Sequence, residues 1–223
     1  MKDILSFLTE VRLNNNREWF HAHKSQFDAV QRKFNIIAED FLKGICEFDS
    51  SVRHLTLKDC TYRFYRDIRF SKDKSPYKTH FGVYVCPGGK KSWKAGYYFH
   101  IEPNWEDGTG GSGLYCGCFM PDREMLQLIR EDLYNDGKNY RKLISKAKGF
   151  SFDKNPSLKK NPKGFPESEF DDLIRLKSYI LEQSISEETL FRKDLNDYLK
   201  EESKKTFPFV KALNEAISFS GNY

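Results

Sequence analysis

The feature that most constrains the fold is a change of hydrophobic period along the chain. Between Phe20 and Ile45 apolar residues recur every three or four positions, which is the spacing of one face of a helix. From about residue 60 to residue 119 the period is two, and clusters of Gly, Pro and Asn separate the short runs. Period two predicts strands, and turn-rich connections between close strands favour antiparallel pairing. The sequence therefore predicts an α+β fold.

The expected elements follow from these periods. A helix is expected over 3–12, followed by a long helix with Asn15 as its N-cap, Glu18 at its third position and an end near Gly44. Strands are expected over 62–70, 80–86, 95–102, 112–119 and 172–181. Further helices are expected over 122–136, 138–147, 187–202 and 206–219. The Pro-, Lys- and Asn-rich region 150–168 is expected to be irregular.

The domain organisation predicted from the sequence is simple, since the chain shows no internal repeat and no linker. We interpret residues 1–223 as one α+β domain, long enough to bury a sizeable core. Its sheet is expected to be mainly antiparallel, with helices packed on one face and a long N-terminal helix.

The composition excludes several classes of protein. With 39% hydrophobic and 31% charged residues the chain is globular and not disordered. No apolar run approaches the ~20 residues of a membrane span, and the apolar patch before Thr9 is too brief for a signal peptide. Five scattered cysteines, an odd number, do not suit a disulfide framework. We therefore expect a reduced, cytoplasmic protein without a membrane partner.

Positive charge is concentrated in two segments. Residues 62–80 hold six Lys or Arg against two Asp, a net charge of +4, and residues 145–164 hold six Lys against Asp153, a net charge of +5. The whole chain carries only +5, so the remainder sums to −4. Because the local field matters more to ligand capture than the net charge, these segments predict contact with an anionic partner.

Four of the expected strands, 62–70, 80–86, 95–102 and 172–181, share an apolar face and a polar face. The polar positions are Arg63, Tyr65, Asp67, Arg69, His80, Tyr84, Tyr98, His100, Glu102, Arg175, Lys177 and Tyr179. One-sided antiparallel sheets are common, and their second face can simply be turned to water. Such a face needs only Thr, Ser, Lys and Glu, whereas Tyr, His and Arg suit contacts with a partner. We therefore place the functional surface on this polar face.

Arg66 is an exception, because it lies in phase with the apolar residues Phe64 and Ile68. A buried guanidinium without a partner costs several kcal/mol. Either an acidic residue pairs with Arg66 in the core, or a bulge turns the side chain outward. We favour a bulge near Arg66 and Asp67, since bulges often re-aim side chains beside functional sites.

The string RDIRFSKDKSPYKTH, residues 66–80, forms a basic loop after the first expected strand. Pro76 holds Ser75 extended, so that Lys72, Lys74 and Lys78 project from a stiffened segment near Arg69. Converging Arg and Lys suit a phosphate group. The alternative is an ion-pair network with Asp67, Asp73 and Glu102, but exposed pairs contribute only ~0–1 kcal/mol each.

This string resembles the most distinctive segment of a widespread microbial family of conserved hypothetical proteins, a domain of unknown function. The resemblance extends over nearly the whole chain through NNNREWFHAHK (14–24), GYYFHIEP (96–103), GGSGLY (110–115), NPKGF (161–165) and LIRLKSY (173–179). The resemblance implies a shared fold and brings no established activity or cofactor. The chain departs from the family pattern at CGC (116–118).

Three other motifs are rejected. PGGKKS (87–92) lacks the spacing and the strand-to-helix context of a P-loop, so it is interpreted as a hairpin loop. GTGGSG (108–113) leads into a strand, whereas a dinucleotide fingerprint opens a helix. Cys116 and Cys118 lie on one side of a strand, but no second Cys or His pair is near in the sequence. We interpret these cysteines as packing residues and not as a zinc site.

The candidate acid–base residues are Asp67, His80 and His100. With Glu102 they supply two histidines and two carboxylates, a set that suits either proton transfer or a divalent metal. A histidine on a polar sheet face is more often a hydrogen-bonded structural residue. We therefore assign no metal site from the sequence, and the cofactor stays unknown.

Three functions are compatible with these residues. The first is binding of a phosphorylated or other anionic ligand on the polar face, with hydrolysis or transfer at a phosphoester as the simplest reaction. Its ligand-binding residues would be Arg63, Arg66, Arg69, Lys72, Lys74, Lys78, Tyr84, Tyr98, Glu102 and Lys177. The second is binding of single-stranded nucleic acid, in which aromatic residues stack on bases. The third is a non-enzymatic protein-interaction domain. The oligomeric state stays open.

Overall fold

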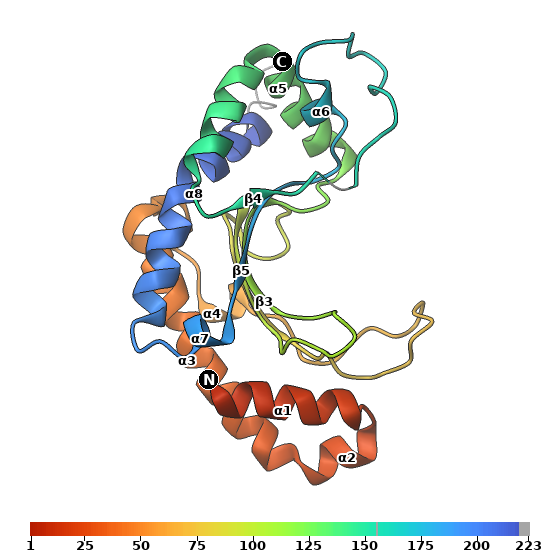
Figure 1. Ribbon diagram of the computed structural model, residues 1–223, viewed down its shortest axis with the longest axis vertical. Helices are drawn as coiled ribbons and strands as arrows, with labels where there is room; N and C mark the ends of the chain where they lie inside the picture. Colours follow the sequence, from red (N-terminus) through yellow and green to blue (C-terminus); the bar gives the residue numbers. More distant parts are fainter. Residues whose placement is uncertain (155, 219–223) are drawn as a thin grey trace.

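A five-stranded antiparallel sheet forms the centre of the computed structural model, which describes residues 1–154 and 156–218 (Figure 1). Its spatial order is β1 (Phe81–Val85), β2 (Gly96–Ile101), β3 (Ser112–Cys118), β5 (Tyr179–Ile185) and β4 (Ser151–Phe152). All four pairs of neighbours are antiparallel. The predicted fold class, α+β with a mainly antiparallel sheet, is confirmed.

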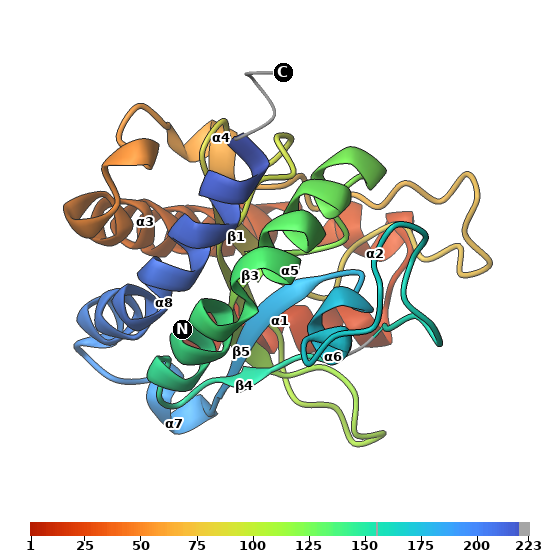
Figure 2. The same cartoon turned by 90° about the horizontal axis from the view of Figure 1, so that it is seen from above.

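Helices cover one face of this sheet. The longest are α3 (Lys24–Phe48), α5 (Arg123–Lys146) and α8 (Leu195–Ser218). Shorter ones are α1 (Lys2–Leu13), α2 (Arg17–Ala22), α4 (Leu57–Cys60), α6 (Asp171–Ile174), α7 (Glu187–Leu190) and the 3₁₀ turn η1 (Ser50–Val52). Figure 1 shows α3 and α8 together on one side of the sheet, while the loop before β1 and the segment before α6 project on the other side. Figure 2 shows α5 beside α8.

Strand alternation separates the core from the open face. Tyr97 of β2 pairs with Cys116 of β3, which pairs with Leu181 of β5, and all three side chains are fully buried under the helices. The intervening residues Tyr98 and Tyr115 pair with each other on the opposite face and are only half-buried. The sheet therefore keeps its apolar side chains on one side and presents aromatic and polar groups on the other.

In the N-terminal helices the predicted N-cap of the second helix is wrong. Helix α1 matches the predicted span, but the N-cap of the next helix is Asn16 and not Asn15, since the Asn16 side chain accepts a hydrogen bond from the Trp19 amide at 2.9 Å. Helix α2 ends at His23, where φ is −106° and ψ is 18°, and α3 then begins. Helix α3 continues past Gly44 to Phe48. Gly44 instead allows close packing, because a Cβ there would lie 3.2 Å from the Lys200 side chain of α8.

The predicted strand over 62–70 is wrong. The described structure gives this segment one isolated bridge, Tyr65 with Tyr77, and Thr61 just before it forms another with Val83. Its chain folds back on itself, since the Arg66 amide donates to Pro76 and the Lys78 amide donates to Phe64. The alternating pattern of residues 62–70 is misleading here, and Phe70, which it assigned to the apolar face, is 95% exposed.

Arg66 needs no bulge in this arrangement, so the favoured interpretation is wrong. Its half-buried guanidinium pairs with Asp73 of the same loop and donates to the Ser75 carbonyl at 3.1 Å. The acidic partner lies seven residues further along an exposed loop, not in the core. The charge is therefore satisfied locally, which explains how Arg66 occupies a position with apolar periodicity.

The predicted strand over 172–181 is also wrong in its first half. Residues Asp171–Ile174 form α6, and β5 begins only at Tyr179. The guanidinium of Arg130 donates to the carbonyls of Ile174 and Leu176, both at 2.8 Å, and so stabilises a turn there. As a result Tyr179 faces the helices and Ile180 faces the open side, the reverse of the predicted phase.

The predicted helices over 122–136 and 138–147 correspond to the two halves of α5, which are divided by a kink with non-helical angles at Asp136. The helices predicted over 187–202 and 206–219 are instead the short α7 and the long α8, which continues through Pro208. Residue 219 of that prediction lies outside the described residues. Residues 151–152 of the region expected to be irregular form β4.

No helix within residues 1–154 and 156–218 combines the length and apolar composition that crossing a membrane requires.

The cysteines give a first testable prediction. All five are unpaired, and burial raises the pKa of Cys60, Cys116 and Cys118 to about 12. At pH 8 only about one such thiol in 10⁴ is ionised, and the thiolate is the reactive form. In the native protein we expect an aromatic disulfide reagent to modify the half-buried Cys46 first and the other four thiols far more slowly. All five should react at once in guanidinium. Equal rates for Cys116 and Cys46 in the native state would contradict this placement.

Candidate functional site

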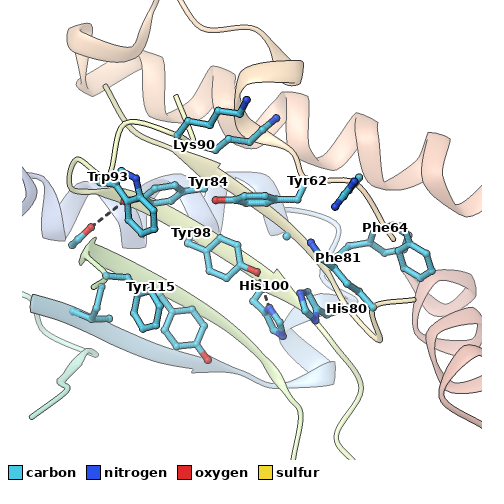
Figure 3. Close-up of a pocket in the computed structure, with 17 residues that line it drawn as sticks. Tyr62, Phe64, His80, Phe81, Tyr84, Lys90, Trp93, Tyr98, His100 and Tyr115 are labelled. Carbon is cyan, nitrogen blue, oxygen red and sulfur yellow. Dashed lines mark hydrogen bonds between the residues drawn. The ribbon is translucent and has the colours of Figure 1, made fainter. Parts of the chain in front are cut away.

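A cavity of about 890 Å³ lies on the open face of the sheet (Figure 3). We call it the aromatic cavity. Its floor is formed by Tyr84 of β1, Tyr98 and His100 of β2, and Tyr115 of β3. The segment after α4 supplies Tyr62 and Arg63, the β1–β2 loop supplies Lys90, Lys91 and Trp93, and Lys78 and His80 precede β1. Residues that are far apart in the sequence therefore converge on one hollow.

The floor is aromatic because neighbouring strands place tyrosines in register. Tyr98 pairs with Tyr84 on one side and with Tyr115 on the other, with ring centroids 6.3 and 6.1 Å apart. Gly82 provides space for Tyr98, since a methyl group added there would overlap the tyrosine ring. The Tyr84 hydroxyl donates to the Lys94 carbonyl at 2.5 Å. Tyr84 therefore contributes its ring to the floor, while its hydroxyl is already engaged.

A line of hydrogen bonds runs along β2 and its end. The Tyr98 hydroxyl lies 3.0 Å from Nδ1 of His100, and Nε2 of His100 lies 3.1 Å from Oε2 of Glu102. These residues are two apart, so a strand places them on the same face. Burial acts to raise the pKa of Glu102, but hydrogen bonds from His100 and Thr79 outweigh it and the net shift is downward. Glu102 is therefore a carboxylate at neutral pH.

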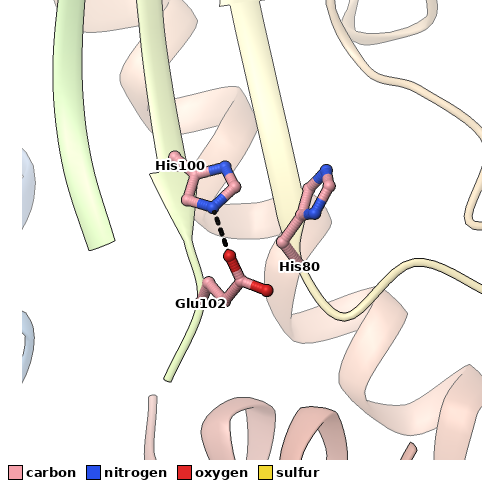
Figure 4. Close-up of side chains that lie close together, drawn as sticks. All are labelled: His80, His100 and Glu102. Carbon is pink, nitrogen blue, oxygen red and sulfur yellow. Dashed lines mark hydrogen bonds and ion pairs between the residues drawn. The ribbon is translucent and has the colours of Figure 1, made fainter. Parts of the chain in front are cut away.

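His80 joins this line from the neighbouring strand end (Figure 4). Its ring centroid is 4.6 Å from that of His100, and both side chains are half-buried. Burial, with the nearby His100, lowers the pKa of His80 to about 4. His80 is therefore neutral at pH 7 and can accept a proton or offer a lone pair.

The most unusual charge at the cavity is Lys78. Its half-buried ammonium lies 5.1 Å from the centre of the Tyr62 ring and forms no ion pair with any described carboxylate. Burial lowers the pKa of Lys78, and the neighbouring Arg63 lowers it further. By contrast, Lys90 donates to the backbone carbonyls of Lys58 and Thr61. In the described part of the chain no Asp or Glu lines the aromatic cavity.

A smaller hollow of about 600 Å³ adjoins the aromatic cavity and shares Lys78 and His80 with it. We call it the side hollow. Arg66, Asp73 and Glu102 line it, together with Arg12 and Trp105 near its edge. Lys78 and His80 therefore lie where the two hollows meet, and Glu102 lies on the side-hollow side of His80.

The structure brings together only part of the predicted site. Six predicted residues line the aromatic cavity: Arg63, Lys78, His80, Tyr84, Tyr98 and His100. Arg66 and Glu102 line the side hollow. The remaining five line neither: Asp67, Arg69, Lys72, Lys74 and Lys177.

Local bonds explain why three of these five lie elsewhere. Asp67 and Arg69 form an exposed ion pair, with the Arg69 Nη2 atom 2.7 Å from Asp67 Oδ2. Lys74 donates to the Ile68 carbonyl at 3.0 Å. The charged side chains at the tip of the basic loop therefore bond to other groups of the same loop. Only the base of the loop, at Lys78 and His80, contacts the cavity.

The lining residues that sequence reasoning missed include Tyr62, Lys90, Lys91, Trp93, Tyr115 and Phe119. Tyr115 could have been found, since Gly113, Tyr115 and Gly117 alternate with apolar residues in the strand at 112–119. Lys90 and Lys91 belong to the PGGKKS loop, which is no P-loop but does bring two cations to the cavity. Trp93 has a φ of 59°, a backbone conformation that non-glycine residues rarely adopt outside functional sites and turns.

Two segments of the resemblance meet beside the cavity. The Asn15 side chain donates to the Tyr77 carbonyl and accepts from the Tyr77 amide, both at 3.0 Å. Phe20 stacks on Tyr77 with ring centroids 3.9 Å apart. Asn15 and Phe20 therefore fix the residue immediately before Lys78.

The Asn15→Ala variant tests this anchor. The Tyr77 amide and carbonyl would both lose a partner, and an unsatisfied buried group costs about 1–3 kcal/mol. We expect amide hydrogen exchange in residues 74–80 to become roughly tenfold faster or more. The matched control is Asn14→Ala, because the Asn14 side chain bonds only to Glu10 within α1. Equal protection of residues 74–80 in both variants would show that Asn15 does not hold the loop.

Comparison with known proteins gives one match. The family model described as "Conserved hypothetical protein (DUF2461)" matches residues 3–211, in agreement with the resemblance found in the sequence. The search of curated proteins and the search of solved structures gave no significant match. The chain therefore belongs to the DUF2461 family of conserved hypothetical proteins.

Proposed function

We propose that the aromatic cavity binds a small anionic molecule that carries a flat ring, with a phosphorylated compound as the best fit. The proposal rests on the surroundings of Lys78. Its half-buried ammonium lines the cavity and has no partner among the described carboxylates. Desolvating a charge without a partner is costly. An anionic ligand beside Lys78 would supply the missing partner.

The other charges of the cavity support an anion. Arg63, Lys90 and Lys91 also line it, while no described carboxylate does. Among them Arg63 is exposed and makes no side-chain hydrogen bond to a described residue, so its guanidinium is available for bidentate contact with a phosphate. Lys78 would provide a point charge further inside.

The walls support a ring. Tyr62, Tyr98, Tyr115, Trp93 and Phe119 surround the hollow, and the last two are 55% and 66% exposed at its margin. Ligand pockets of ~300–1,000 Å³ with apolar walls and few polar groups suit compounds of nucleotide size. Exposed aromatic side chains beside a cavity are also costly to keep in water unless they contact a ligand.

The chemistry that fits this floor is hydrolysis or transfer at a phosphoester. His80 and His100 are close enough to act on one bound group, and Glu102 orients the His100 ring. Asp67, the third predicted acid–base residue, forms an ion pair with Arg69 outside the cavity and has no part in this proposal. The five unpaired thiols suit a reducing, cytoplasmic setting.

One observation favours a second candidate, binding of single-stranded nucleic acid. Lys146, Lys148, Lys154, Lys159, Lys160 and Lys163 are all exposed, and none lines the cavity. In Figure 1 the segment that carries most of them and the basic loop project on the same side of the sheet, at its two ends. A strand of nucleic acid could contact both. Its affinity would then fall steeply with salt, because many phosphates would be neutralised.

The Lys78→Met variant tests the proposal. Because the folded state lowers the pKa of Lys78, the unfolded chain holds this proton more tightly, and the charge destabilises the fold at neutral pH. Methionine keeps the apolar stem and removes the charge. We expect a melting temperature without ligand that is unchanged or higher, together with a loss of anion affinity of roughly 10–100-fold, the size of a charged hydrogen bond.

The measurement is thermal stability and calorimetry against nucleoside monophosphates, sugar phosphates and short oligonucleotides at two salt concentrations. A ligand at 100 times its dissociation constant stabilises the fold by ~2.7 kcal/mol. Arg69→Met is the matched control, since Arg69 is paired outside the cavity. Retained affinity in Lys78→Met, or equal losses in both variants, would refute the small-anion site. Stabilisation by oligonucleotides alone, with a steep salt dependence, would select the second candidate.

A further inference from the structure

His80, His100 and Glu102 form a compact cluster of potential metal ligands. One ligand atom from each residue lies within 4.8 Å of the other two, and all three side chains are half-buried (Figure 4). The register of β1 and β2 creates the cluster. Phe81 pairs with Ile101, so His80 just before β1 lies across from Glu102 just after β2. His100 lies on the same face two residues earlier.

Hydrogen bonds from outside the cluster orient two of its members. The Tyr98 hydroxyl bonds to Nδ1 of His100, which leaves Nε2 directed at Glu102. On Glu102, Oε1 accepts from Thr79 at 2.6 Å and from Trp105 at 3.4 Å, which leaves Oε2 directed at His100. Metal-binding histidines and carboxylates are typically held in this way, with one atom bonded to an outer partner and the other turned toward the ion.

The third member has a free lone pair. Neither ring nitrogen of His80 forms a hydrogen bond with another described residue, although the ring lies beside that of His100 at an interplanar angle of 38°. A half-buried imidazole ordinarily finds a hydrogen-bond partner in the protein or in water. His80 is thus held in place by its ring contacts, with its nitrogens available to a ligand.

We propose that His80, His100 and Glu102 together bind one divalent transition-metal ion. Two imidazole nitrogens with one carboxylate oxygen suit Zn²⁺, Fe²⁺, Co²⁺ or Mn²⁺, whereas Mg²⁺ and Ca²⁺ prefer oxygen ligands alone. This inference goes beyond the proposed function. It does not depend on the cationic residues that would bind the anion, since they do not belong to the cluster, but a bound ion would replace the acid–base role proposed above for His80 and His100.

Binding requires a modest rearrangement. Ligand atoms on a tetrahedral ion with bonds of ~2.0–2.1 Å lie about 3.4 Å apart. The His100 Nε2 and Glu102 Oε2 atoms are 3.1 Å apart, so this pair needs almost no change. Only His80 must turn inward. His100 would carry its proton on Nδ1 and donate it to the Tyr98 oxygen, and Nε2 would be free for the ion.

Such an ion would leave coordination positions open toward the ligand. His80 and His100 line the aromatic cavity, and three protein ligands do not complete the coordination of a transition metal. The ion would add a charge of +2 beside the single negative charge of Glu102. The positive field that favours an anion in the cavity would therefore increase.

The test is calorimetric titration of untagged protein, first treated with EDTA and dialysed, with Co²⁺, Zn²⁺ and Mg²⁺. We expect one Zn²⁺ or Co²⁺ per chain at micromolar or lower concentration, no comparable binding of Mg²⁺, and visible absorption bands of Co²⁺ bound to nitrogen ligands. His80→Ala should weaken Co²⁺ binding at least 100-fold. Tyr98→Phe, which keeps the ring and removes only the outer hydrogen bond, should weaken it about tenfold.

The matched control is His54→Ala, because His54 is exposed and outside the cluster. Absence of saturable Co²⁺ or Zn²⁺ binding to the wild-type protein would overturn the proposal. Equal affinity in His80→Ala and His54→Ala would also overturn it. Anion titrations in EDTA, and metal titrations without anion, are run separately. Loss of the metal site would thus leave the anion proposal standing, and the reverse also holds.

Discussion

The floor of the candidate site depends on the register of β2 between β1 and β3. Its odd-numbered residues Tyr97, Phe99 and Ile101 are fully buried under the helices, and its even-numbered residues Tyr98 and His100 form the floor of the aromatic cavity. A shift of one residue would exchange the two sets. The same buried contacts that stabilise the sheet therefore place the tyrosine and the histidine, and no loop has to be ordered for them to meet.

The charged part of the site depends on a second constraint, the anchoring of the basic loop. Asn15 and Phe20 hold Tyr77, and this places Lys78 and His80 at the edge of the sheet while the tip of the loop stays exposed. Most charges of the tip are neutralised within the loop, through Arg66 with Asp73 and Arg69 with Asp67. Lys78, at the base of the loop where the two hollows meet, is half-buried and forms no ion pair with a described carboxylate.

The hydrophobic period of the sequence predicted strands β1, β2 and β3 correctly. The predictions were wrong where contacts of single side chains determine the local structure. Strands β1, β2 and β3 and their polar face follow from alternation, because one face must be buried. The segment 62–70 also alternates, but ion pairs within the loop and its return to Tyr77 prevent a strand. The turn before β5 depends on Arg130, which is more than 40 residues away in the sequence. Lys90 and Lys91 were missed because a hairpin loop gives no periodic signal for where its side chains point.

In the proposed function a bound anion neutralises the half-buried ammonium of Lys78. This role of Lys78 is tested most directly by measuring its pKa with NMR of ¹³C-labelled lysine side chains, in the free protein and after adding a nucleoside monophosphate. We expect the pKa of Lys78 in the free protein to lie below the ordinary value for a lysine, because burial disfavours its charge, and to rise when the anion is bound. A pKa of Lys78 that is not lowered in the free protein and does not change when the anion is added would contradict the proposal.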